Sequence, residues 1–191
     1  HVANTMPQPY YRFDGSDDYI NLDLLAAELV DTSNTKGSIV WSGKIHDFTT
    51  NYGMLWQYGD TNGASYIFLC VSTTDYKLRA KSFVASAIQW EFESDNTFSQ
   101  DVEMTIVLVQ DGTSPILYVN GSLEPTTFST STDTDSWFDE LTAVDNGRLG
   151  CQNNAGGGNA NFLNHTVNSY RVFNKALTAT EVKELYSGAS V

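Results

Sequence analysis

The sequence predicts an all-β fold, a two-sheet antiparallel β-sandwich with one short C-terminal helix. Short candidate strands recur between turn-forming residues along the whole chain, as expected of a sandwich. Only 17% of the residues are charged, while serine, threonine, asparagine and glycine abound, which favours strands and turns over helices. A length of 191 residues with ten Phe, ten Tyr and four Trp suits one domain, spanning 1–191, with a sizeable aromatic core.

The expected strands are separated by short polar connections. Residues 102–110 are apolar on both faces, which indicates a central strand, whereas 126–136 and 154–161 are polar or glycine-rich and predict loops. The full set of expected strands covers 10–13, 18–22, 37–45, 53–58, 65–72, 75–82, 89–94, 102–110, 115–120, 146–151 and 166–173.

The sixth and seventh expected strands carry charges at every second residue, so each has one charged and one apolar face. An antiparallel register with Arg79 opposite Glu91 and Lys77 opposite Glu93 matches charge with charge. The same cations could instead form a basic stripe for anionic glycans. We favour the salt-bridged hairpin, because it accounts for both signs of charge.

The C-terminal segment departs from the β pattern. Thr178 and Glu181 have the spacing of a capping box, which predicts a helix over 179–186. Asp23 at the start of 24–29 indicates a second, shorter helical turn.

The net charge is −13, which excludes several classes of partner. A field of this sign repels phosphate backbones, so nucleic acid is not an expected partner. No apolar run has the length needed to insert into a membrane. No signal-like segment opens the sequence at His1, so any export signal is expected to have been removed or to lie upstream. Cys70 and Cys151 could form a disulfide or remain two buried thiols, and the spacing does not decide between them.

Four segments along the chain form a recognisable series: YRFDG at 11–15 with DYI at 18–20, LYVNG at 117–121, GRLG at 147–150 and YRVFNKALT at 170–178. Together, in this order, they resemble the concanavalin A-like, laminin-G-like jelly-roll superfamily over nearly the whole chain. The resemblance implies two antiparallel sheets packed face to face. Members serve as carbohydrate-binding modules, adhesion domains, appended domains of large enzymes, and components of viral or cell-surface assemblies, so the fold alone does not assign a function.

The chain departs from the superfamily at two places. An aspartate that usually precedes the closing strand is replaced by Asn168 and Ser169, and the usual Trp-His pair is replaced within 102–104. These departures weaken the transfer of individual site residues.

The resemblance also implies a structural Ca²⁺ site, where the opening turn meets the closing strand. Asp14, Asp17 and Asp18 crowd that turn, and Asn168 is the amide expected to complete the set. Carboxylate and amide oxygens are the hard ligands that Ca²⁺ prefers. The alternative is that the aspartates only shape the turn.

The catalytic glycosidases of the superfamily carry Glu-x-Asp-x-x-Glu on one strand, and this motif is absent from the sequence. Glu91 and Glu93 come closest, but basic neighbours account for them. The three histidines show no metal-ligand spacing. We therefore expect a binding domain rather than an enzyme.

Glycan binding requires exposed aromatic rings on which a sugar can stack, with polar groups beside them for its hydroxyls. The candidates are Trp41, Trp56, Tyr58 and Trp137, each of which could instead belong to the core. Trp137 is the most suggestive, because it lies in an acidic segment.

The leading interpretation is a non-catalytic recognition module for carbohydrate or adhesion at an extracellular, cell or virion surface, with a neutral glycan or a surface protein as its partner. The first alternative is a structural or decoration component of a larger virus or cell-surface assembly. The second is a glycan-active enzyme with a non-standard site. A glycan binder should expose aromatics in one groove, whereas an assembly component should bury them and show an apolar patch.

Overall fold

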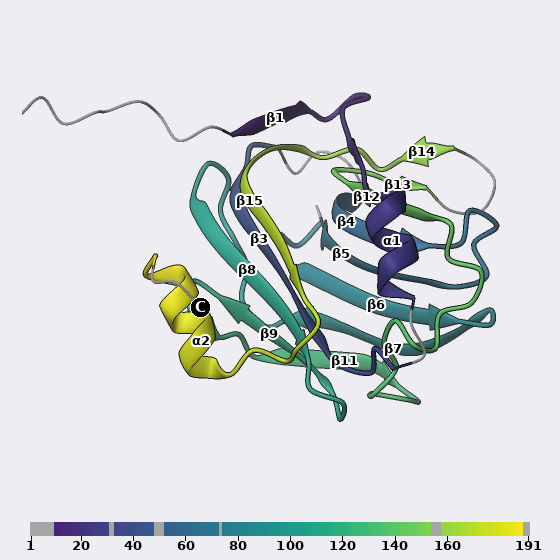
Figure 1. Cartoon of the computed structure of the whole chain (residues 1–191). Coiled ribbons are helices and arrows are strands. Elements are labelled where there is room, and N and C mark those ends of the chain that lie inside the picture. The colour runs from purple at the N-terminus through teal and green to yellow at the C-terminus, as the bar shows by residue number, and fades with distance from the viewer. Residues whose placement is uncertain (1–9, 31–32, 48–51, 73, 154–157, 189–191) are drawn as a thin grey trace, which may run out of the picture.

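The computed structural model describes residues 10–30, 33–47, 52–72, 74–153 and 158–188. These residues form two antiparallel sheets packed face to face (Figure 1), as the sequence predicts. The six-stranded sheet contains, in spatial order, β1 (Tyr11–Asp14), β15 (Asn164–Phe173), β3 (Gly37–Ile45), β8 (Glu103–Gln110), β9 (Pro115–Val119) and β10 (Ser122–Leu123).

The second sheet is seven-stranded, and a two-stranded ribbon accompanies it. In spatial order the sheet contains β11 (Thr126–Ser131), β7 (Ala87–Ser94), β6 (Leu78–Val84), β5 (Tyr66–Ser72), β4 (Tyr52–Gly59), β12 (Asn146–Leu149) and β2 (Ile20–Asn21). The ribbon consists of β13 (Gln152–Asn153) and β14 (Asn159–Ala160), and the two helices are α1 (Asp23–Leu29) and α2 (Ala179–Tyr186).

The core lies between the two sheets, where alternate residues of each strand point inward. Trp41 of the six-stranded sheet and Trp56, Tyr58, Trp90 and Phe92 of the seven-stranded sheet are fully buried there. Burying one such aromatic side chain stabilises the fold by roughly 2–3 kcal/mol. These rings therefore supply much of the driving force for closing the sandwich.

Helix α2 covers the outer face of the six-stranded sheet (Figure 1). Leu177 and Val182 pack there against the outward side chains Val40, Val107 and Tyr118. The helix begins at a capping box, as predicted: the Glu181 amide donates to Thr178 Oγ1 and the Thr178 amide donates to Glu181 Oε2. The outer face of this sheet is therefore occupied by a helix.

Segment 126–136, predicted to be a loop, begins with strand β11. Its residues alternate between half-buried and exposed, and it pairs with β7 at the edge of the sheet. Phe128 packs against the core, while the neighbouring serines and threonines face solvent. Because this edge strand is polar at nearly every position, its sequence shows no alternation of apolar and polar residues that would predict a strand.

The β6–β7 hairpin pairs charge with charge, but its register is shifted by two residues from the prediction. Arg79 lies opposite Glu93 and Lys81 opposite Glu91. A two-residue turn and a β-bulge together explain the difference. Ala85 and Ser86 both have positive φ, at 49° and 65°, so the turn pairs Val84 with Ala87, and the register then shifts by one further residue between Ser82 and Phe83. Two such residues make a two-residue hairpin turn that usually requires Asn-Gly, so Ala-Ser gave no signal.

Cys70 and Cys151 are both free and buried, which leaves the thiol alternative standing. Burial raises the pKa of each thiol to about 12, so neither is a reactive thiolate at neutral pH. Among the described residues, no helix is long and apolar enough to span a membrane.

Candidate functional site

The outer face of the seven-stranded sheet gathers charged, amide and aromatic side chains from neighbouring strands. Strand alternation sends Phe68 of β5, Lys81 of β6 and Glu91 of β7 to this face, and the register places the three side by side. Arg79 and Glu93 form a second such row, two residues along the same strands. A flat hydrogen-bonded sheet thus fixes each group at a defined spacing.

Two pockets lie on this face, and they share a wall formed by Arg79 and Glu91. We call them together the outer-face groove. The first, of about 260 Å³, is further lined by Tyr52, Met54, Tyr66, Phe68, Lys81, Gln152 and Asn161. The second, of about 450 Å³, is further lined by Lys77, Glu93, Thr127, Phe128 and Ser129.

A third pocket, of about 300 Å³, opens between loops at the end of the sandwich. Among the residues that the structure describes, no charged side chain lines it, so these residues offer fewer directional contacts than those of the outer-face groove. Its lining consists of Tyr76, Phe98, Ser99 and Gln100.

The charges of the groove are paired with one another. Arg79 forms an ion pair with Glu93 and donates from Nη1 to the Tyr52 hydroxyl at 2.8 Å, while Lys81 Nζ lies 3.0 Å from Glu91 Oε1. Partial burial tends to lower the pKa of Arg79, but the hydrogen bond and charge of Glu93 outweigh it, and the pKa is raised above its usual value. The groove therefore presents fixed donors and acceptors whose charges largely cancel.

Two amides and one cation in the groove remain without a side-chain partner. Within the described residues, no hydrogen bond of the Gln152 or Asn161 side-chain amide and no ion pair of Lys77 is found. An amide both donates and accepts, which is the pattern that a sugar hydroxyl requires. These groups are free to bind a ligand without breaking an internal contact.

Tyr52 is the most exposed aromatic ring of the groove, at 38%. The guanidinium carbon of Arg79 lies 5.0 Å from the centroid of this ring, which holds the ring in place. Tyr66 stacks on Phe83 with 4.7 Å between the ring centroids, so that neighbour covers part of it. Tyr52 is therefore the ring best placed to contact a ligand.

The four aromatics that the sequence indicated as ligand contacts lie in the core instead. Trp41, Trp56 and Tyr58 are 0% exposed and Trp137 is 1% exposed, so the expectation that they are exposed is wrong. The first three point inward from their strands. Trp137 follows β11 and meets the ring of Phe138 edge-on at 4.9 Å. A sugar cannot stack on any of them without opening the sandwich.

The structure does bring the three aspartates of the opening turn together. Carboxylate oxygens of Asp14, Asp17 and Asp18 lie within 4.8 Å of one another, and all three residues are exposed. The Asp14 amide donates to Asp18 Oδ2 at 3.0 Å, and the Ser16 amide donates to Asp14 Oδ1 at 2.7 Å. These contacts shape the turn and still leave carboxylate oxygens free for a cation, so the donor set suits Ca²⁺.

Asn168, the amide expected to complete this cluster, lies elsewhere. Its side chain donates to Glu103, and the β1–β15 register places Asn164 opposite Asp14 instead. The buried Oδ1 of Asn164 has no hydrogen-bond partner in the described part of the chain. The closing strand therefore does meet the acidic turn, but four residues earlier than the motif spacing indicated.

The sequence singled out the charged residues of the groove, but as a salt-bridged hairpin and not as part of a binding site, and it did not indicate the other members. The hairpin charges were visible as an alternation, and only their partners were misassigned. Tyr66 and Phe68 were hidden because β5 is apolar on both faces, so no period distinguishes its outward residues. Gln152 and Asn161 gave no signal, since tertiary contacts place them.

No protein-family model and no curated protein sequence matches the chain. Solved structures do share its fold. The CBM40 module of the Ruminococcus gnavus IT-sialidase, bound to α2,3-sialyllactose, superposes with a TM-score of 0.69 at 17% identity, covering 93% of this chain and 98% of that one. The NanB sialidase of Streptococcus pneumoniae (K499G mutant) gives 0.71 at 19% identity and 91% coverage of this chain, but only 27% of its own.

The leech intramolecular trans-sialidase behaves in the same way, with a TM-score of 0.67 at 17% identity, covering 96% of this chain and 28% of the enzyme. This chain therefore corresponds in extent to the separate module and to about a quarter of each whole enzyme. At these identities the likeness concerns architecture: the chain has the β-sandwich fold of the sialidase CBM40 modules.

Proposed function

We propose that this chain is a non-catalytic carbohydrate-recognition module that binds its ligand in the outer-face groove. One observation carries the proposal: a rigid sheet presents fixed ion pairs, free amides and an exposed tyrosine within one groove. This combination meets the needs of a sugar, which offers hydroxyls to polar groups and an apolar ring face to an aromatic.

The structural neighbours support the same class of ligand. The CBM40 module, 98% of whose own length matches this chain, is bound to α2,3-sialyllactose in one structure. A second structure of the module contains α2,6-sialyllactose. The enzymes that match do so over about a quarter of their length. The setting we propose is an extracellular, cell or virion surface, because glycans are displayed there.

The test is isothermal titration calorimetry with lactose, 3′-sialyllactose and 6′-sialyllactose as probes. The comparison of lactose with its two sialylated forms distinguishes a neutral from an acidic ligand. The paired variants are Tyr52→Ala in the groove and Tyr11→Ala on β1, since both residues are exposed tyrosines and only the first lines the groove. Trp137→Ala is unsuitable, because it removes a core ring.

We expect at least one probe to bind, with affinity about 10-fold weaker in Tyr52→Ala and unchanged in Tyr11→Ala, as befits loss of one aromatic contact. Binding that is equal in both variants would move the site away from the groove. An absence of binding to these probes and to a broad glycan array, with the protein folded, would refute carbohydrate recognition.

A structural role in an assembly is the second candidate, and one observation favours it. Leu123 on β10 and Tyr186 on α2 are 63% and 51% exposed, and Gly121, two residues before Leu123, lies against Tyr186. An apolar pair of this kind suits a protein contact. Light scattering across a concentration series, with Leu123→Ser as the variant, tests self-association through this edge.

We also propose that the cluster of Asp14, Asp17 and Asp18 holds a structural Ca²⁺, with Asn164 in place of Asn168 as the neighbouring amide. The convergence of three carboxylates and the unpartnered Oδ1 of Asn164 support the proposal. The ion would supply charge neutralisation at the junction of β1 and β15.

A further inference from the structure

Gln57 and Arg148 are two polar residues on the outer face of the seven-stranded sheet. Both are almost completely buried, at 0% and 7% exposure. They are register partners on adjacent strands, Gln57 on β4 and Arg148 on β12. Polar side chains on the outer face of a sheet ordinarily remain in solvent. Their burial therefore indicates that another element lies over them.

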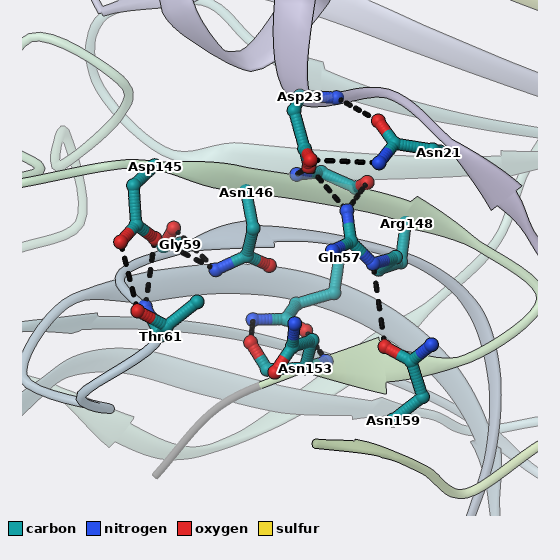
Figure 2. A network of polar contacts seen from close by, with 11 residues as sticks. Asn21, Asp23, Gln57, Gly59, Thr61, Asp145, Asn146, Arg148, Asn153 and Asn159 are labelled. Carbon is teal, nitrogen blue, oxygen red and sulfur yellow. Dashed lines mark hydrogen bonds and ion pairs between the residues drawn. The ribbon is translucent and has the colours of Figure 1, made fainter. Parts of the chain in front are cut away.

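That element is the β13–β14 ribbon. The Asn153 amide donates to Gln57 Oε1 at 2.6 Å, and Gln57 Nε2 reaches the Asn153 carbonyl oxygen at 3.4 Å. Arg148 Nε donates to Asn159 Oδ1 at 3.3 Å (Figure 2). Asn153 and Asn159 are themselves register partners. One pair of facing residues in the sheet thus holds one pair of facing residues in the ribbon.

Arg148 is fixed from its other side as well. It forms an ion pair with Asp23 and donates from Nη1 to the Gly147 carbonyl oxygen at 2.7 Å. Its guanidinium carbon lies 5.5 Å from the ring centroid of Tyr19. Arg148 therefore ties the ribbon to the start of α1, and its side chain has little freedom to let the ribbon shift.

The ribbon residues Asn153 and Asn159, which Gln57 and Arg148 contact, are flanked along the chain by the two residues whose amides enter the outer-face groove. Gln152 immediately precedes Asn153 on β13, and Asn161 immediately follows β14. A shift of the ribbon would move both amides relative to Arg79, Lys81 and Glu91 on the opposite side of the first pocket. The position of the ribbon therefore sets the geometry of that pocket.

We propose that Gln57 and Arg148 are positioning residues of the carbohydrate site, which hold Gln152 and Asn161 at the spacing that the ligand requires. Neither residue lines the groove, so each acts through the ribbon. The inference rests on the function proposed above. It adds that the affinity for the sugar depends on two buried side chains outside the groove, because these side chains fix the position of the β13–β14 ribbon.

The test compares Gln57→Leu with Gln110→Leu, a matched control elsewhere in the sandwich. Gln110 is also 0% exposed, and its Nε2 donates to the Thr134 carbonyl oxygen at 3.0 Å, far from the ribbon in sequence and on the other sheet. Each change removes the side-chain amide of one fully buried glutamine, together with its hydrogen bonds to a neighbouring segment. Two readouts are taken: sugar affinity by calorimetry, and hydrogen exchange of the peptide that contains Asn153.

We expect Gln57→Leu to weaken sugar binding about 10-fold and to accelerate exchange at Asn153, because an amide loses its acceptor. Gln110→Leu should lower thermal stability comparably while leaving affinity and that exchange unchanged. Gln57→Glu keeps the acceptor and should restore both readouts. If Gln57→Leu does not fold, Asn159→Ala removes the partner of Arg148 without altering the sheet, and should weaken binding in the same direction.

Two outcomes overturn the inference and are distinguishable from each other. Wild-type affinity in Gln57→Leu and Asn159→Ala, with binding of the probe by the parent protein intact, would show that the clamp is only structural. Failure of the parent protein to bind any probe would remove the carbohydrate function itself, and the positioning role with it.

Discussion

His165 makes the stability of this protein depend on pH in a way that can be worked out from its surroundings. The imidazole is 0% exposed, stacks on Phe13 at 4.4 Å between ring centroids, and lies 6.0 Å from Trp41. Nδ1 lies 2.7 Å from the Leu163 carbonyl oxygen, which can only accept, so this nitrogen carries the proton. Nε2 is buried and has no hydrogen-bond partner among the residues that the structure describes.

Burial lowers the pKa of His165 from 6.5 to about 4, against a smaller opposing effect of the Leu163 hydrogen bond. Between pH 6.5 and 4 the imidazole of His165 is mostly protonated in the unfolded chain and mostly neutral in the folded protein. The free energy of unfolding must therefore fall as the pH falls from 6.5 to 4. At pH 5 the loss amounts to about 2 kcal/mol, and below pH 4 it levels off near 3 kcal/mol.

Urea unfolding at pH 7 and pH 5 measures this loss, with His165→Phe as the variant that cannot titrate. Carboxylates that titrate in the same range contribute equally to both proteins, so the difference between the two pH dependences isolates His165. We expect the variant to lose about 2 kcal/mol less between the two pH values. Identical pH dependences in the parent and His165→Phe would refute the reasoning.

Three further predictions concern separate parts of the fold. Addition of 10 mM CaCl₂ should raise the melting temperature by about 3 °C in the parent and not in Asp17→Asn, and equal melting in CaCl₂ and EDTA would contradict the calcium proposal. Thr178→Ala removes the capping box of α2 and should lower the melting temperature by about 2–4 °C, with circular dichroism showing intact strands; an unchanged value would mean that the cap contributes nothing. The double change Ala85→Asn, Ser86→Gly supplies the residues that positive φ favours and should raise the melting temperature by a similar amount, whereas a decrease in calorimetry would count against the turn assignment.

The sequence predicts those parts of the fold whose signals are local. Strand β3 and helix α2 have the bounds expected from their periodicity and capping residues, because neighbours along the chain determine both. The register of the β6–β7 hairpin was not predictable in this way. It depends on two residues, Ala85 and Ser86, that adopt positive φ although their chemistry does not favour it, and on a β-bulge between Ser82 and Phe83.

The candidate site was predicted only in part, because its members are brought together by contacts distant in sequence. The aromatic residues chosen from the sequence have the right chemistry, but inward and outward positions of the largely apolar strands that hold Trp41, Trp56 and Tyr58 cannot be separated by pattern. Trp137 lies in a connection after β11, and contacts distant in sequence bury it. Asn164 illustrates a smaller error, since the strand was identified correctly and the residue that meets the acidic turn lies four positions before the expected Asn168.

The charge of the whole chain and that of the groove impose different requirements on a ligand. The net charge of −13 repels any anion at long range, with a reach set by a Debye length of about 8 Å at physiological salt. Within the groove, Arg79 and Lys81 are already paired with Glu93 and Glu91, so an incoming carboxylate would compete with two internal ones. Lys77 alone adds a positive charge without a partner among the described residues. Ionic attraction can therefore contribute little to the affinity of the proposed carbohydrate site. Most of that affinity must come from hydrogen bonds to amides and carboxylates that are already in position. The geometry that we propose Gln57 and Arg148 maintain then determines how tightly a sugar binds.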